Sequence, residues 1–158
     1  MGFFSRLFNW NDSTSALTPA TQTASELALD AKAAAAVLAE IDVDKAIAAH
    51  ENWKTRLQDQ LSGTSTEQLD PAVVCLDDRC ELGKWLHGPG GQRLSKYPAF
   101  SVLVARHQYF HVQAAAVVTQ NLAGDLPGAD RTLKGPFRYA SNQVVLLLKE
   151  LKRGLGQR

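Results

Sequence analysis

Three of the four histidines in this chain fall on apolar stripes of predicted helices, and this placement constrains the fold more than any other feature. His107 and His111 stand four residues apart in a stretch whose apolar residues recur at helical spacing, so both imidazoles project from one helix face. His50 lies on a similar stripe, between Ile47 and Trp53. Burying an imidazole without a partner is costly. The core must therefore supply a partner for all three rings.

A shared divalent ion would satisfy the three imidazoles together, and Cys80 is the natural fourth ligand. This cysteine opens the segment Cys-Glu-Leu-Gly-Lys-Trp-Leu, in which the glycine permits close backbone approach and the tryptophan can anchor a turn. Three imidazoles and one thiolate form a tetrahedral nitrogen and sulfur set that suits Zn²⁺. The sequence therefore predicts one zinc ion per chain, with four ligands: His50, Cys80, His107 and His111.

Four protein ligands leave no coordination position for an activated water, so the predicted site is structural or sensory. We accordingly expect no catalytic residues and no enzyme. The alternative is a zinc enzyme in which water displaces one ligand. Glu51 and Glu81 adjoin two of the ligands in sequence, but the sequence offers no well-placed general base for such a reaction.

The hydrophobic periodicity predicts an all-α protein. Ala and Leu are abundant and β-branched runs are few, which favours helix. Helices are predicted over residues 23–41, 42–61, 79–87, 98–122 and 128–153, with a loop over 62–78 that follows Ser62-Gly63. The pattern leaves open whether the first two helices are continuous. It also leaves open whether Gly135-Pro136 kinks the last helix or delays its start. Gly88-Pro89-Gly90-Gly91 is expected to end the short helix.

Size and charge exclude several classes of protein. The 158 residues fit one domain with an appendage, and 45% of them are apolar. The formal net charge of +1 argues against nucleic acid as a partner. No run of about 18 apolar residues is present, so no transmembrane helix is expected. The start of the chain also lacks the apolar core of a secretory signal, and we expect a cytoplasmic protein.

Two regions are predicted, an N-terminal segment with a linker over residues 1–22 and a zinc-binding helical bundle over residues 23–158. The first ten residues contain an aromatic cluster, which consists of Phe3, Phe4, Leu7, Phe8 and Trp10. Three interpretations of this cluster stay open: docking on a membrane surface, on a partner, or back on the bundle. Arg6 is its one basic residue, which favours docking on protein over membrane contact.

Several polar residues near the predicted site have two interpretations. Cys75 stands in an apolar run, so we expect a buried, inert thiol. His87 borders the Gly-rich segment and is expected outside the ligand set, either exposed or behind a ligand. Asp77 and Asp78 precede Arg79 and are expected to cap the short helix there. Alternatively, one of the two carboxylates accepts a proton from a ligand imidazole.

The order of these motifs resembles the chemoreceptor zinc-binding (CZB) domain of bacterial signalling proteins. His50 comes first, the Cys-x-Leu-Gly-x-Trp-Leu segment follows over residues 80–86, and the His-x-x-x-His pair at His107 and His111 comes last. Ala-His-Glu-Asn-Trp-Lys around His50 and Tyr-Pro-Ala-Phe before the histidine pair add to the likeness. The resemblance covers roughly residues 40–125, and the final predicted helix is compatible with it.

The resemblance implies a four-helix bundle, often dimeric, with a short extra helix that carries the cysteine ligand of one zinc ion. Such domains regulate chemoreceptors or diguanylate cyclases in response to zinc or oxidants. We therefore expect a regulatory module of chemotaxis-type signal transduction, with redox sensing at Cys80. Because the sequence shows no attached receptor helix or cyclase domain, output is expected through a homodimer, a chemoreceptor or diguanylate cyclase type of partner, or the N-terminal segment. The alternative is a structural or zinc-storage protein whose ion never leaves.

Overall fold

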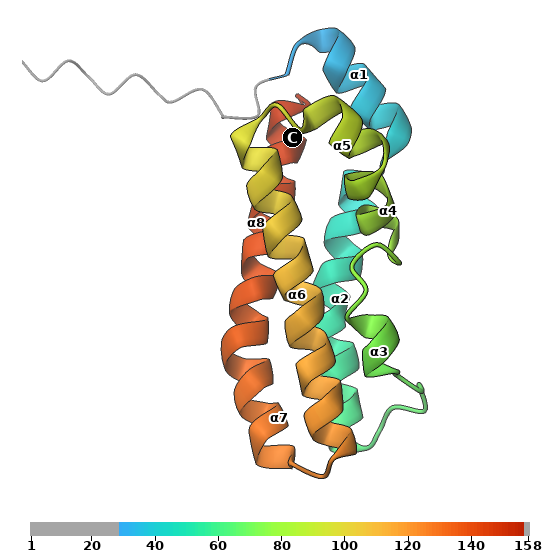
Figure 1. Cartoon of the computed structure of the whole chain (residues 1–158), viewed down its shortest axis with the longest axis vertical. Helices are drawn as coiled ribbons and strands as arrows, with labels where there is room; N and C mark the ends of the chain where they lie inside the picture. Colours follow the sequence, from blue (N-terminus) through green and yellow to red (C-terminus); the bar gives the residue numbers. More distant parts are fainter. Residues whose placement is uncertain (1–28, 157–158) are drawn as a thin grey trace, which may run out of the picture.

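The computed structural model describes residues 29–156, and the elements in this range are helices joined by turns (Figure 1). In chain order they are α1 Ala31–Glu40, α2 Val43–Ser62, α3 Pro71–Val74, α4 Glu81–His87, α5 Pro89–Leu94, α6 Pro98–Leu122, α7 Leu126–Thr132, the π-helical turn η1 Leu133–Phe137 and α8 Arg138–Gly154. The predicted all-α fold is confirmed. The predicted N-terminal segment and linker (residues 1–22) and the first residues of the predicted helix 23–41 lie outside the described residues.

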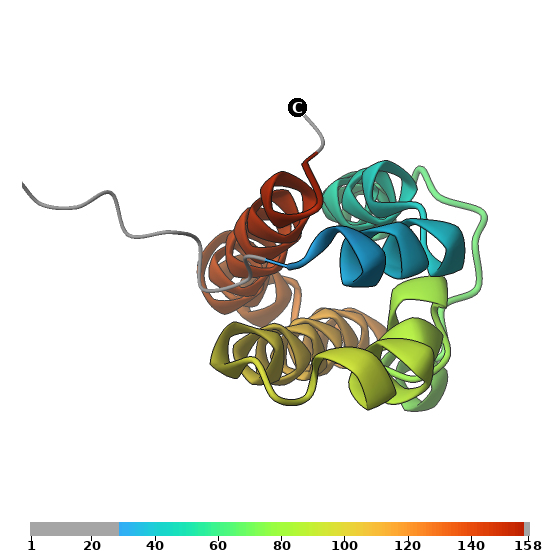
Figure 2. The ribbon, with the colours of Figure 1, turned by 90° about the horizontal axis from the view of Figure 1, so that it is seen from above.

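The helices form a bundle with four corners. Helix α2, helix α6 and the column of α7, η1 and α8 each run along the length of the molecule (Figure 1). The short helices α3, α4 and α5 follow one another at the fourth corner, beside α2 and α6, and α1 lies across the end of the bundle (Figure 2). The fourth helix of the predicted four-helix bundle is thus a chain of short helices, and the predicted extra helix with Cys80 at its start is one of them.

Local capping explains where the first helices begin and end. The side chain of Asp30 accepts a hydrogen bond from the backbone of Ala33, and the side chain of Asp42 accepts one from Lys45. The extended backbone at Ile41 and Asp42 separates α1 from α2, so the two predicted helices are not continuous. Gly63, with a φ of 72°, ends α2 as predicted.

Three prolines influence where the helices begin and how they continue. The predicted loop 62–78 contains one helical turn, α3, which begins at Pro71. Pro89 begins α5 directly after α4, because a proline at the first helical position loses no backbone hydrogen bond. Of the two alternatives for Gly135-Pro136, a delayed start of the last helix is wrong, because Pro136 lies inside a helical turn. The wider π turn over Leu133–Phe137 accommodates its missing N–H within a continuous column.

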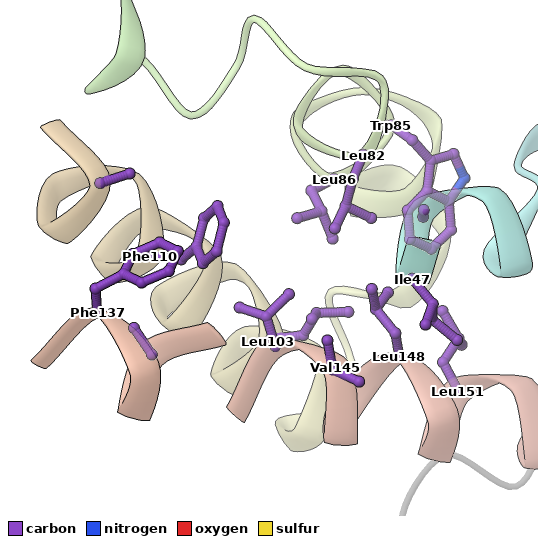
Figure 3. Packing of buried hydrophobic residues seen from close by; sticks show 14 of the residues in the cluster. Ile47, Leu82, Trp85, Leu86, Leu103, Phe110, Phe137, Val145, Leu148 and Leu151 are labelled. Atoms are coloured by element: carbon purple, nitrogen blue, oxygen red, sulfur yellow. The ribbon is translucent and has the colours of Figure 1, made fainter. Parts of the chain in front are cut away.

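The core lies along the inner faces of the long helices and includes α4. Phe110 of α6 and Phe137 of η1 have ring centroids 5.2 Å apart, and both side chains are fully buried. Leu82 and Leu86 of α4 point toward the core side chains of α6 and α8 (Figure 3). Leu122 shares the helical spacing of His107 and His111 but is 68% exposed, because it lies in the last turn of α6. No helix within residues 29–156 is long and apolar enough to cross a membrane.

Val104 on α6 and Leu147 on α8 stand at the apolar helical spacing of their helices, but both are only half-buried. Both still pack against the core from its edge. The fully buried positions of α6 include Leu103 and Phe110 instead. The predicted helix faces are therefore rotated slightly from the observed ones, while the histidine positions on them stay inward.

The segment that leads into α4 packs backbone against backbone. A Cβ atom at Gly83 would overlap the carbonyl oxygen of Asp77 and lie 2.7 Å from its carbonyl carbon. Glycine is therefore the residue that lets the turn before α4 fold back on the helix, as predicted for close approach.

We expect Gly83→Ala to destabilise the protein by about 1–3 kcal/mol, since the new methyl group must push the turn off the helix. Gly135→Ala is the matched control, because no heavy atom of the described residues outside its own helix lies within 4 Å of that position. The control should destabilise the protein less than Gly83→Ala does, because its added methyl group crowds only the ring of the following Pro136. Urea denaturation of both variants gives the comparison, and equal midpoints would contradict this account of Gly83.

Candidate metal centre

Three histidines and one cysteine converge from three segments of the chain. This His/Cys cluster consists of His50 on α2, Cys80 at the start of α4, and His107 and His111 on α6. One nitrogen or sulfur atom from each residue lies within 4.8 Å of all the others. Zinc bonds of about 2.0–2.3 Å hold tetrahedral ligand atoms about 3.3–3.6 Å apart. Small side-chain movements would therefore bring all four atoms to one ion.

Two of the imidazoles are oriented by backbone carbonyls. Nδ1 of His50 donates to the carbonyl oxygen of Ala46 at 2.7 Å, one turn earlier on α2. Nδ1 of His111 donates to the carbonyl oxygen of Val74 on α3 at 2.8 Å. The proton therefore lies on Nδ1 in both rings, and Nε2 carries the lone pair. Within residues 29–156 neither Nε2 atom has a hydrogen-bond partner, although both are buried. A metal ion would satisfy both acceptors.

The third imidazole has different neighbours. The side chain of His107 is fully buried, and its Nε2 lies 3.3 Å from the sulfur of Cys80. Its Nδ1 lies 3.6 Å from Oδ2 of Asp77. The ring thus presents Nε2 to the other ligand atoms and Nδ1 to a carboxylate, which is the usual surrounding of a zinc-bound histidine.

Cys80 is placed by the start of a helix. It is the N-cap of α4, and its sulfur accepts a hydrogen bond from the backbone N–H of Gly83 at 3.3 Å. The N–H groups at the start of a helix favour a thiolate, but burial outweighs them here and raises the pKa of the Cys80 thiol. The predicted capping by Asp77 or Asp78 is wrong. The chain is still in a turn at Arg79, and the Asp77 carboxylate faces His107 and His87.

Burial sets the protonation states of the four residues in the His/Cys cluster. It lowers the pKa of His50 to about 4. Burial, followed by the neighbouring His111 and His50, lowers the pKa of His107 to about 2. Burial also lowers the pKa of His111 and raises the pKa of the Cys80 thiol. At neutral pH the imidazoles are therefore ready to bind metal, whereas the thiol must first release its proton.

The remaining thiol and histidine lie outside the cluster. Cys75 is exposed, so its predicted burial is wrong. It follows the single turn of α3, in which Val74 is the buried side chain, and its sulfur contacts the carbonyl oxygen of Ala72 at 3.3 Å. His87 is exposed, as expected of a residue outside the ligand set, and its Nε2 lies 2.8 Å from Oδ2 of Asp77.

Two tryptophans stiffen the surroundings of the cluster. Trp53 is half-buried with its ring centroid 6.4 Å from that of His111, and the Arg56 guanidinium lies 3.8 Å above its ring. Trp85 packs edge-on against Phe100, and its Nε1 donates to Glu40. Trp53 therefore shields the imidazoles directly, while Trp85 anchors the helix that carries the cysteine.

Sequence reasoning missed the carbonyl groups that orient the rings. The acceptor from Ala46 can be found from the four-residue spacing to His50, because a helix places that carbonyl one turn earlier. The acceptor from Val74 has no sequence signal, since every residue carries the same carbonyl.

Two cavities reach the cluster from outside. One of about 490 Å³ is lined by His50, Cys80 and Trp53 among others. A second of about 380 Å³ is lined by Cys80, Trp53 and His111 among others. The sulfur-bearing residue is common to both, so small molecules can approach it although the imidazoles are buried.

Comparison with protein families supports this geometry. Residues 50–118 match the family described as chemoreceptor zinc-binding domain, and the matched range includes all four residues of the His/Cys cluster. The chain contains a CZB domain. Neither the comparison with curated proteins nor that with solved structures found a match. The cofactor of a CZB domain is zinc, and here the His/Cys cluster is close enough to bind one ion.

We expect the zinc affinity of the CZB domain to fall about tenfold for each unit by which pH drops from 8 to 6. Over that range the Cys80 thiol loses one proton on binding, whereas the imidazoles are already neutral. The slope should steepen only toward about pH 4, where His50 takes up a proton. Competition with a chromogenic chelator at several pH values measures the slope. A loss of about a hundredfold per unit between pH 8 and 6 would contradict the assigned states.

Proposed function

We propose that the His/Cys cluster holds one zinc ion and that the domain is a sensory or regulatory module rather than an enzyme. The observation that carries the proposal is the convergence of three buried imidazoles and one thiol on a single point. Four protein ligands fill a tetrahedral ion, so no position remains for a hydrolytic water. The match to a chemoreceptor zinc-binding domain favours a sensory over a catalytic role.

The arrangement suits control by zinc or by an oxidant. The ion would join α2, α6 and the start of α4, so its loss would release the short helices from the long ones. Cys80 is half-buried and lines both cavities. A peroxide that reached the thiolate would be reduced to water as the sulfur became a sulfenic acid, and the ion would lose one ligand.

Output would pass through a second copy of the chain or through a signalling partner of the chemoreceptor or diguanylate cyclase type. The outer faces of α6 and α8 carry exposed apolar side chains, which are Val102, Tyr109, Val112, Tyr139 and Leu146. The two faces adjoin, since the guanidinium of Arg106 lies 5.7 Å from the ring of Tyr139. A reducing cytoplasm suits the free thiols of Cys75 and Cys80.

A structural or storage role is the second candidate, and one observation favours it. The three imidazoles are at most 3% exposed, and such burial would slow release of the ion. The two cavities at Cys80 favour exchange instead, and for that reason we place the regulatory role first.

We expect purified wild-type protein to contain about one zinc per chain, and Cys80→Ala and His107→Ala to lose more than about a hundredfold in zinc affinity. Cys75→Ala is the matched control, because that thiol is exposed and outside the cluster. Elemental analysis and chelator competition give the stoichiometry and the affinity. Wild-type affinity in Cys80→Ala would remove the cysteine from the site.

A second experiment separates the two roles. For a regulatory site, a strong chelator should remove zinc reversibly, and backbone hydrogen exchange should rise over residues 75–87 while α6 and α8 stay protected. The reason is that the short helices lose their tie to the ion, whereas the long helices keep their own core. For a structural site, the metal should leave only when all helices exchange together.

A further inference from the structure

Asp77 lies directly behind one ligand of the proposed zinc site. Its Oδ2 is 3.6 Å from Nδ1 of His107, and its side chain is only 16% exposed. Nδ1 of His107 is buried and has no hydrogen-bond partner among the described residues. An imidazole that binds metal through Nε2 carries its proton on Nδ1. The Asp77 carboxylate is placed to accept that proton after a small movement.

The three imidazoles differ in the group that faces Nδ1 and orients the ring. His50 and His111 donate from Nδ1 to main-chain carbonyl oxygens, which no side-chain substitution can remove. His107 instead faces a carboxylate from another segment. A carboxylate also makes the imidazole a stronger donor to the metal than a carbonyl does. Of the three rings, His107 is thus the one whose support depends on the identity of a side chain.

Asp77 is itself fixed by α4. Its Oδ2 accepts a hydrogen bond from Nε2 of His87, the last residue of that helix, at 2.8 Å. Its carbonyl oxygen lies 3.8 Å from the sulfur of Cys80, the residue that caps the same helix. The backbone of Gly83 packs against that carbonyl group. Both ends of α4 therefore hold Asp77 in place.

We propose that Asp77, held by His87, is a positioning residue of the zinc site, which accepts the Nδ1 proton of His107 and directs its Nε2 at the ion. This inference rests on the proposed zinc site. It adds that α4 contributes to the site twice, through the Cys80 ligand at its start and through the His87–Asp77 pair behind a ligand of α6.

The test compares zinc affinity in Asp77→Ala, Asp77→Asn and the neighbouring control Asp78→Ala. Asp78 is more than half exposed and pairs with Arg79. We expect Asp77→Ala to weaken zinc binding about 10–100-fold. Asp77→Asn should lose less, because an amide oxygen can accept the same proton without the charge. Asp78→Ala should stay within about twofold of wild type, since removal of an exposed ion pair has little effect.

Imidazole ¹⁵N NMR of the zinc-loaded protein distinguishes positioning from general stability. In Asp77→Ala the Nδ1–H signal of His107 should move, while those of His50 and His111 stay in place. The His87→Ala variant should give a smaller shift of the same signal. If Asp77→Ala does not fold, the Nδ1–H signal of His107 is measured in Asp77→Asn, and a shift of that signal supports the positioning role.

The results for the Asp77 variants test the positioning role, and those for Cys80→Ala and His107→Ala test the zinc site itself. Wild-type zinc affinity and an unmoved His107 signal in the Asp77 variants would overturn the positioning role. If Cys80→Ala and His107→Ala lose zinc at the same time, the site itself stands. If they retain it, the proposed zinc site fails instead.

Discussion

The structure depends on the burial of three imidazoles in an apolar core. Each ring loses its contact with water, and burial lowers the pKa of all three, so they enter the fold as neutral groups. A neutral imidazole still has one donor and one acceptor nitrogen, and both need partners. The donors of His50 and His111 have carbonyl partners. The acceptor nitrogens converge with the sulfur of Cys80. One cation can therefore bind the acceptors that have no donor in the protein interior.

This arrangement makes metal binding and local folding parts of one equilibrium. Structural zinc contributes apparent free energies of about 10–16 kcal/mol in zinc-finger peptides, whereas a whole domain is stable by about 5–15 kcal/mol. The long helices keep a core of their own around Phe110 and Phe137. The turn before α4 has less apolar support, since Cys75, Leu76 and Asp78 are exposed. The effect of the ion should therefore concentrate in the short helices.

The sequence predicts the parts of the fold that depend on periodicity. The stripes around His50, His107 and His111 identify the helices and correctly place these three histidines on the inward faces. The prediction from sequence fails where the path of the backbone determines which side chains are buried and where helices begin. An apolar run cannot tell which side of a single turn faces inward, so Cys75 is wrongly predicted as buried. Pro89 both follows one helix and begins the next, and residue type alone does not separate the two roles.

If the domain is regulatory as proposed, the partners of the α6 imidazoles would make the short helices its responsive part. His111 donates to a carbonyl of α3, and His107 faces Asp77 in the turn that follows. The same segment then supplies Cys80 as the N-cap of α4. By contrast, His50 is oriented by its own helix. One short stretch thus contributes a ligand and also orients both ligands of α6. A change at the sulfur, whether loss of zinc or oxidation, would therefore act on the stretch that arranges half of the remaining site.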